Sequence, residues 1–198
     1  MIDKERFQKQ LDFILEADKE KNIFRQTHLS GHGRRENDAE HAWHMAIMIY
    51  LLKEYANEEI VVAKAMMISL IHDIVEIDAG DTYAYDTAGL ETQKEREEKA
   101  AERIFGMLPE DQKAELKSLF EEFEAYATPE AKFARAMDNF QPLLLNNSNN
   151  GGDWREHGVS KSQIMKRHQK TRLGSEIIGD YSEALIEENV KKGNLKDE

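Results

Sequence analysis

Apolar residues recur along this chain every three or four positions, which is the spacing of one face of an α-helix. The pattern predicts a first helix over about residues 3–20, whose apolar stripe consists of Phe7, Leu11, Ile14 and Leu15. Two later segments, about 38–55 and about 59–75, are apolar on nearly every side. Helices of that kind lie in the centre of a domain rather than on its surface.

Start and stop signals divide the rest of the chain. Asp38 is the expected N-cap of the first central helix, and Thr128-Pro129 is a strong start signal for a helix that carries Asp138. Polar, glycine-containing stretches at 21–37, 79–90 and 146–152 indicate loops. Proline occurs only three times, and no internal repeat or linker interrupts the pattern. We therefore expect an all-α helical bundle in a single domain that spans residues 1–198.

Composition narrows the functional classes. The 198 residues are 40% hydrophobic, which is enough for one core, and they include no cysteine, so thiolate nucleophiles and cysteine-based zinc sites are excluded. A formal net charge of −12 argues against nucleic-acid polymers and anionic membranes as partners. The chain has no 18-residue apolar stretch and no secretory signal pattern at its start, so we expect a cytoplasmic location.

The doublet His72-Asp73 ends a nearly uninterrupted apolar run over residues 60–71. A carboxylate in such a place is expensive to bury unless it is paired or bound to a metal ion. His41 begins an inward-facing stripe of its own on the preceding helix, with Met45 one turn later. A single inward histidine is more often a satisfied core residue, but two histidines together with Asp73 favour a metal site.

Three further acids are candidates for chemistry. Glu76 follows His72 by one helical turn, where it would assist a metal-bound water, although a solvated helix end is the alternative. Asp81 comes just after Gly80 and is a proton donor, a substrate contact or a simple turn former. Asp138 lies in an otherwise apolar stretch, and taken alone it is more often a surface residue than a ligand.

These residues resemble the HD-domain metal-dependent phosphohydrolases. The similarity lies in Glu40-His41, in His72-Asp73 about thirty residues later and in a distant Asp138, and it extends over about residues 5–185. The local strings DAEHAW from residue 38, IHDIVEIDAGD from residue 71 and AMD from residue 136 resemble the branch that contains the bacterial 5′-deoxynucleotidases. The resemblance is specific for the metal site and less specific for the substrate.

The resemblance implies a ligand set and a catalytic group. The implied ligands of one divalent transition metal (Mn²⁺, Co²⁺, Zn²⁺ or Fe²⁺) are His41, His72, Asp73 and Asp138. Glu76 and Asp81 match positions tied to catalysis and substrate contact. Arg25 aligns with an arginine that contacts the substrate phosphate, although Gln26 follows it here where those enzymes carry tryptophan.

Other cations and histidines near these positions have open roles. Arg34 and Arg35 are alternative anion contacts or ordinary loop charges. His44, one turn past His41, is expected to support the site rather than to bind the metal. On the resemblance alone we also expect a homodimer.

The resulting functional hypothesis is hydrolysis of a small phosphorylated substrate, namely the phosphomonoester of a (deoxy)ribonucleoside 5′-monophosphate. A phosphodiester or a nucleoside triphosphate is the alternative substrate for the same site. A regulatory protein that keeps the fold without catalysis is a second alternative, and an ordinary helical bundle with internally satisfied polar residues is a third.

Overall fold

The fold is built almost entirely of helices, as the apolar spacing predicts. The computed structural model describes residues 2–198, apart from the side chain of Thr87. The elements in chain order are α1 (Lys4–Ala17), the 3₁₀-helix η1 (Asp18–Asn22), β1 (Phe24–His28), β2 (Arg35–Asn37), α2 (Asp38–Leu52), the 3₁₀-helix η2 (Lys53–Tyr55), α3 (Val62–Ile71), α4 (Glu76–Ala79), α5 (Thr87–Phe105), α6 (Glu110–Ala125), α7 (Pro129–Ser148), α8 (Gly152–His157), α9 (Lys161–His168), α10 (Thr171–Gly174) and α11 (Glu176–Lys191).

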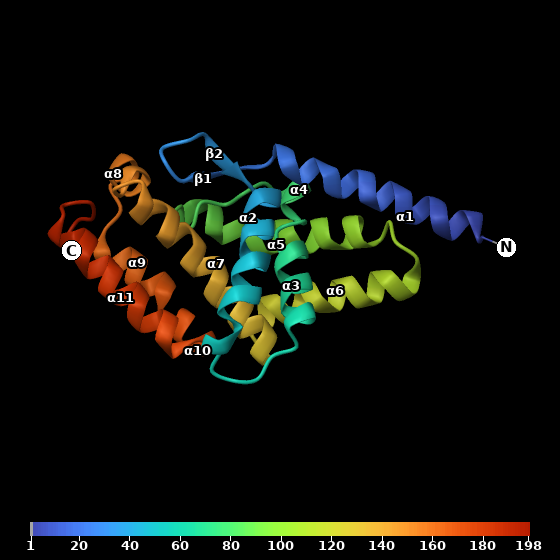
Figure 1. Ribbon diagram of the computed structural model, residues 1–198. Coiled ribbons are helices and arrows are strands. Elements are labelled where there is room, and N and C mark those ends of the chain that lie inside the picture. The colour runs from blue at the N-terminus through green and yellow to red at the C-terminus, as the bar shows by residue number, and fades with distance from the viewer. Residues whose placement is uncertain (1) are drawn as a thin grey trace.

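The helices α2, α3 and α7 form the centre of the molecule. Figure 1 shows α2 and α3 side by side in front of α7, with α6 on one side, α8 to α11 on the other, and α5 crossing behind α2 and α3. The main core joins α2, α3, α7, α9 and α11 and contains Met45, Ile68, Phe133, Met137 and Ile186. A second apolar cluster lies between α4, α5 and α6. The all-α prediction is therefore confirmed, and both segments that are apolar on every side are central helices.

Local signals explain where the central helices begin and end. Thr128 accepts a hydrogen bond from Ala131 N and Pro129 is the first helical residue, so α7 starts as predicted. The helix α3 stops at Ile71, and the chain turns through residues 72–75 before α4. The helix predicted over about 59–75 is thus shorter at both ends, and His72 and Asp73 lie in the bend between α3 and α4.

Two segments differ from their predicted structure. Residues 24–37, expected as part of a loop, form a two-stranded antiparallel hairpin in which Phe24 pairs with Asn37 and His28 with Arg35. Its turn contains Gly31 and His32, which both have positive φ. The stripe of α1 faces solvent, with Ile14 62% and Leu15 69% exposed, because this helix extends from the body of the fold (Figure 1).

Among the described residues, the helices are too short or too polar to cross a membrane.

Candidate metal centre and active-site cavity

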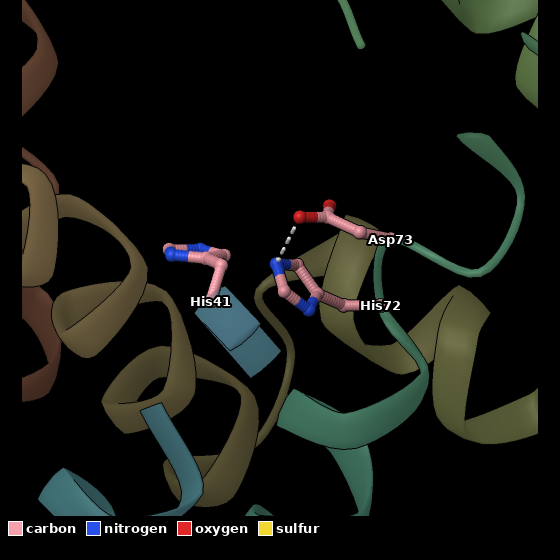
Figure 2. A group of neighbouring side chains, drawn as sticks. All are labelled: His41, His72 and Asp73. Atoms are coloured by element: carbon pink, nitrogen blue, oxygen red, sulfur yellow. Dashed lines mark ion pairs between the residues drawn. The ribbon is translucent and has the colours of Figure 1, made fainter. Parts of the chain in front are cut away.

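Four predicted ligands meet at the centre of the bundle. His41 comes from the first turn of α2, His72 and Asp73 from the bend after α3, and Asp138 from the middle of α7. His41 is fully buried, and His72 and Asp138 are nearly so. The candidate ligand atoms of His41, His72 and Asp73 all lie within 4.8 Å of one another (Figure 2). Asp138 Oδ1 lies 3.2 Å from His41 Nε2 and 3.9 Å from His72 Nε2.

Hydrogen bonds on the outer nitrogen orient both imidazole rings. His41 Nδ1 lies 3.0 Å from Gln141 Oε1. The amide nitrogen of Gln141 donates to Glu36 Oε1 at 2.5 Å, which fixes the orientation of the amide group. Because an amide oxygen can only accept, the Nδ1 atom of His41 donates the hydrogen bond. His72 Nδ1 donates to the carbonyl oxygen of Ser69 at 2.8 Å. In the neutral tautomers set by these bonds, both Nε2 atoms carry a lone pair, and both point into the cluster.

This arrangement places acceptor atoms against acceptor atoms. His72 Nε2 is buried, lies 3.0 Å from Asp73 Oδ2 and has no partner of adequate hydrogen-bond geometry among the described residues. His41 Nε2 lies 3.2 Å from Asp138 Oδ1 in hydrogen-bond geometry, and such a bond would require a proton on one of the two atoms. Lone pairs at such distances need a proton or a cation between them. Two imidazoles and two carboxylates are a donor set that suits a divalent transition metal, so the residues present fit the implied metal.

The pKa values of these groups follow from burial and from their neighbours. Burial lowers the pKa of His41 to about 4, which keeps its ring neutral. Burial also opposes charge on His72, but Asp73 outweighs it and raises the pKa of this ring. Burial acts to raise the pKa values of both Asp73 and Asp138. Contacts with His72 and Arg25 outweigh burial for Asp73 and bring its pKa below the ordinary value. Contacts with His41 and Arg167 do the same for the pKa of Asp138. Both ligand carboxylates are therefore ionised.

Arg25 holds two carboxylates of the cluster, those of Asp73 and Asp38, in place. It comes from β1, and its Nη1 atom donates to Asp73 Oδ2 at 2.8 Å and to Asp38 Oδ1 at 3.3 Å. Its guanidinium is largely buried. A buried arginine between two carboxylates holds both in place, and removal of one partner from such a group is strongly destabilising.

Asp38 and Glu76 form an acid pair beside the ligands. Both side chains are buried, and one oxygen of each has no hydrogen-bond partner among the described residues. Their carboxylate oxygens and one of Asp73 lie within 4.8 Å of one another. Burial and the charge of Asp73 raise the pKa of Asp38 to about 7 and that of Glu76 well above its ordinary value. This pair therefore holds a proton near neutral pH.

The cluster opens into a cavity of about 620 Å³. Asp73, Glu76 and Asp138 line its floor, while Asp81 and the aromatic residues Tyr83 and Tyr85 come from the loop between α4 and α5. The two tyrosine rings meet edge to face at 5.3 Å. Burial raises the pKa of Asp81, which makes this carboxyl a candidate proton donor. A cavity of this size with a few converging charged groups is suited to a small molecule.

A family model described as HD domain matches residues 17–177 of this chain. The chain belongs to the HD domain family. The matched residues include the bend that carries His72 and Asp73.

Similar proteins carry names that bear on chemistry. The crystal structure of a predicted metal-dependent phosphohydrolase from Magnetospirillum magnetotacticum is 48% identical, covers 96% of each chain and superposes with a TM-score of 0.93. A conserved hypothetical protein from Pyrococcus furiosus is 27% identical, with a TM-score of 0.53 over 72% of this chain and 83% of its own. The human 5′-deoxynucleotidase HDDC2 is 32% identical over 111 residues, which are 56% of this chain and 53% of that protein. The matched region thus spans about half the length of the curated relatives.

Several residues of this HD domain site were not expected from the sequence. Asn37, not the expected Asp38, caps α2. The Asn37 side chain accepts a hydrogen bond from the backbone nitrogen of Glu40, and the Glu40 carboxylate accepts one from the backbone nitrogen of Asn37. The capping box leaves the Asp38 side chain free to point into the site. Gln141 is one helical turn after Asp138 on α7, a spacing that could have revealed it.

Two further arginines contact the ligand Asp138. Arg135 Nη1 lies 3.2 Å from Asp138 Oδ2, and the Arg135 guanidinium stacks 3.7 Å from the ring centre of Phe123. Arg167, from α9, lies 3.6 Å from the same oxygen and lines the cavity. Its position far along the chain provides no local signal. Arg35, in contrast, is not brought to the cavity, and its guanidinium approaches Glu156 at 3.8 Å.

Proposed function

We propose that this HD domain protein is a metal-dependent phosphohydrolase that acts on the phosphomonoester of a (deoxy)ribonucleoside 5′-monophosphate. The observation that carries the proposal is the buried His41, His72, Asp73 and Asp138 cluster, which opens into a cavity lined by arginine. The names of the similar proteins, a predicted metal-dependent phosphohydrolase and 5′-deoxynucleotidases, agree with that chemistry.

His41, His72, Asp73 and Asp138 would hold one divalent transition metal (Mn²⁺, Co²⁺, Zn²⁺ or Fe²⁺). When bound, the ion would polarise the phosphate and lower the pKa of a water molecule. Gln141 and the Ser69 carbonyl oxygen contribute by keeping both imidazoles in the neutral tautomer. The four ligands come from three separate elements, so the site forms only when the fold is complete.

The arginines provide the positive charge that a phosphate needs. Arg25 and Arg167 both line the cavity, Arg25 next to Asp73 and Arg167 next to Asp138. A phosphomonoester carries close to two negative charges, and guanidinium groups bind its oxygens in pairs. We therefore assign phosphate binding to Arg25, together with Arg167.

Two acids have the environment required for proton transfer. Glu76 and Asp38 share one proton near neutral pH, so the pair keeps one ionised carboxylate, which would accept a proton from the attacking water. Asp81, whose pKa burial raises, would donate a proton to the departing 5′ oxygen. Water thus supplies the new P–O bond, the ester P–O bond breaks, and the products are a nucleoside and inorganic phosphate. The tyrosines of the loop between α4 and α5, with Trp154, provide apolar walls for the base and sugar.

The partners follow from the same considerations. We propose a homodimer that resides in the cytoplasm and takes a small phosphorylated substrate, without a nucleic-acid polymer or a membrane as partner. The net charge of −12 supports the exclusion of anionic polymers and lipid surfaces.

The test is a phosphatase screen with Mn²⁺, Co²⁺, Zn²⁺ or Fe²⁺ against ribo- and deoxyribonucleoside 5′-monophosphates. A phosphodiester and nucleoside triphosphates serve as the alternative substrates. Release of inorganic phosphate from monophosphates is expected, with loss of both turnover and bound metal in Asp73→Ala and no loss in Asp12→Ala, an exposed acid of α1. A fully active, metal-free Asp73→Ala protein would overturn the site, and preference for a diester or triphosphate would overturn the substrate.

A further inference from the structure

Acidic residues are unevenly distributed along this chain. Asp and Glu account for 39 of the 198 residues, yet residues 157–175 form a run of 19 residues without an acid. The other acid-free runs longer than 13 residues are 21–35 and 139–152. All three runs contribute residues to the lining of the cavity. In a chain with a net charge of −12, the cavity wall thus draws on the longest stretches that lack acids.

The longest of these runs is also basic. It contains α9 and α10, and its five Lys and Arg residues are Lys161, Lys166, Arg167, Lys170 and Arg172. We call residues 161–172 the basic segment. Its first and last cations do not line the cavity, and each has an acid at ion-pair distance. Lys161 Nζ lies 2.6 Å from Glu187 Oε1, and Arg172 Nη1 lies 2.6 Å from Asp180 Oδ1.

The two other lysines of the basic segment carry charge that no neighbouring acid neutralises. Lys166 and Lys170 are exposed and also line the cavity, so they lie at its opening. Within the described part of the chain, neither lysine has a carboxylate oxygen within 4.0 Å of its Nζ atom. Lys170 Nζ lies 4.3 Å from the centre of the Tyr126 ring and donates to its hydroxyl group at 3.3 Å. This contact positions the charge of Lys170 without neutralising it.

The acids of the cavity do not cancel the charge at the opening. Four of them lie within ion-pair distance of an arginine or a histidine, namely Asp73, Glu124, Asp138 and Asp153. Burial raises the pKa of the other three, which are Glu76, Asp81 and Glu97. Among the described lining residues, the exposed cations are Lys94, Lys166 and Lys170, and the exposed acid is Glu124. Glu124 contacts Arg135 at 2.8 Å, and Glu98 approaches Lys94 only to 3.8 Å, so the exposed charge at the opening is mostly positive.

We propose that Lys166 and Lys170 guide an anionic phosphorylated substrate into the cavity by long-range attraction, before its phosphate reaches Arg25 and Arg167. The inference rests on the proposed function, because it takes the substrate to be a phosphomonoester. Such a group carries about −1.5 to −2 charges at pH 7, and a chain with a net charge of −12 repels it. Clefts lined by one sign of charge concentrate ligands of the opposite sign, so a cationic opening gives the anion a favourable path through a repulsive field.

The basic segment is continuous from the opening to the candidate metal centre. Arg167 lies between the two lysines in sequence, and its Nη2 atom is 3.6 Å from Asp138 Oδ2. A phosphate attracted to the opening would therefore meet the next cation of the same segment beside a proposed ligand. A structural alternative exists for Lys166, because a cation in the last turn of a helix also complements the helix dipole. That alternative predicts an effect on stability and none on substrate capture.

The salt dependence of the kinetics tests the proposal. The cavity variant is Lys166→Gln/Lys170→Gln. The control is Lys161→Gln/Lys192→Gln, which changes the net charge equally at lysines that pair with Glu187 and Glu188 outside the cavity lining. The substrate is 2′-deoxyadenosine 5′-monophosphate, with Mn²⁺ present. At about 0.01 M salt, where the Debye length is about 30 Å, the cavity variant should have a KM about tenfold above that of the wild type and a similar kcat. At about 1 M salt, where the Debye length is about 3 Å, this difference should disappear.

The control should match the wild type at both salt concentrations. Equal KM values for the cavity variant and the control at low salt would overturn the proposal. A defect that persists at high salt would overturn it too, because it would indicate direct contact with the substrate. A lower thermal midpoint with an unchanged KM would assign the lysines to the stability of the α9 end instead. Lys166→Gln alone should raise KM about threefold at low salt, and it keeps the contact between Lys170 and Tyr126.

Two further ligands separate this inference from the proposed function. Deoxyadenosine has no charge, so its inhibition constant should be the same for the wild type and the cavity variant. If the wild type hydrolyses no monophosphate, the proposed function fails, and calorimetric titration with inorganic phosphate still tests the lysines. Phosphate should then bind more weakly to the cavity variant than to the control at about 0.01 M salt. Equal affinity of the two variants for phosphate would overturn the role of Lys166 and Lys170.

Discussion

Gln141 is the residue whose replacement best separates orientation of the ligands from their chemistry. Its amide oxygen accepts the Nδ1 proton of His41 at 3.0 Å, and its amide nitrogen is directed to Glu36 at 2.5 Å and to His44 Nδ1 at 3.2 Å. Gln141→Leu removes all three contacts and keeps a side chain of similar size. No proposed ligand atom is deleted, so the variant still contains all four proposed ligands.

Two effects of similar magnitude are expected, one on metal binding and one on the free energy of unfolding. Loss of the group that orients a ligating imidazole weakens metal binding by about 10–100-fold, which is about 1.4–2.8 kcal/mol. Loss of the amide also leaves Glu36, already raised to a pKa of about 7 by burial, without its donor. A buried acceptor left unpaired costs about 1–3 kcal/mol of the free energy of unfolding. A loss of folding stability alone does not weaken metal binding by the folded protein. A weaker affinity of folded Gln141→Leu for the metal would therefore report on the orientation of His41.

The assay is calorimetric titration of the metal-free protein with Mn²⁺, combined with urea unfolding. Asn189→Leu is the matched control, because Asn189 is a fully buried amide on α11 that bonds to Asn147 and Leu185 and does not contact the site. Both variants should lose stability, but only Gln141→Leu should lose metal affinity. A folded Gln141→Leu protein that binds Mn²⁺ as tightly as the wild type would refute the assigned orientation of His41.

Three further predictions concern other parts of the structure. Burial lowers the pKa of His168 to about 3, so its contribution to stability is complete above about pH 6.5 and is lost as the pH falls towards 3; at pH 5 the loss is about 2 kcal/mol. Urea unfolding at pH 8 and pH 5 should show a smaller difference for His168→Leu, and an unchanged difference would contradict this account. Gly174→Ala places a Cβ 2.2 Å from the carbonyl oxygen of Lys132 and should cost about 1–3 kcal/mol in thermal unfolding, whereas Gly152→Ala, with no neighbour nearer than 3.9 Å, should change it little. Arg167→Met should raise the KM for a nucleoside monophosphate about tenfold with a smaller change in kcat; an unchanged KM would exclude Arg167 from phosphate binding.

The sequence was sufficient for the parts of the site that carry a local pattern. The doublet His72-Asp73 stands out because it ends an apolar run, and His41 because it begins one. The structure brings both to one point with Asp138, whose own residue pattern offered only apolar surroundings and whose role as a ligand came from the family resemblance. Their roles as ligands remain a prediction that metal analysis will decide.

The positions of Asp38 and Arg167 in the site could not be predicted from the residues next to them in the sequence. Asn37 and Asp38 are both good N-caps, and the antiparallel pairing of Asn37 with Phe24 accompanies the choice that turns Asp38 inwards. Arg167 reaches the cavity only because α9 packs against α7. Local propensity can predict that a helix begins near residue 38, but not which of two adjacent caps will be used when a strand ends beside it.

The apolar pattern of α2 and α3 leads to a more general point. A segment that is apolar on every side predicts a helix covered on every side, and both helices are central in this fold. Within a single chain, however, α7 covers only their inner side, and Trp43, Tyr50 and Leu51 stay exposed on the other. Each exposed apolar side chain forgoes roughly 25 cal/mol for every Å² of its surface that burial would remove from water. The apolar pattern therefore predicts both helices and their central place, but it does not predict which of their sides the fold leaves exposed.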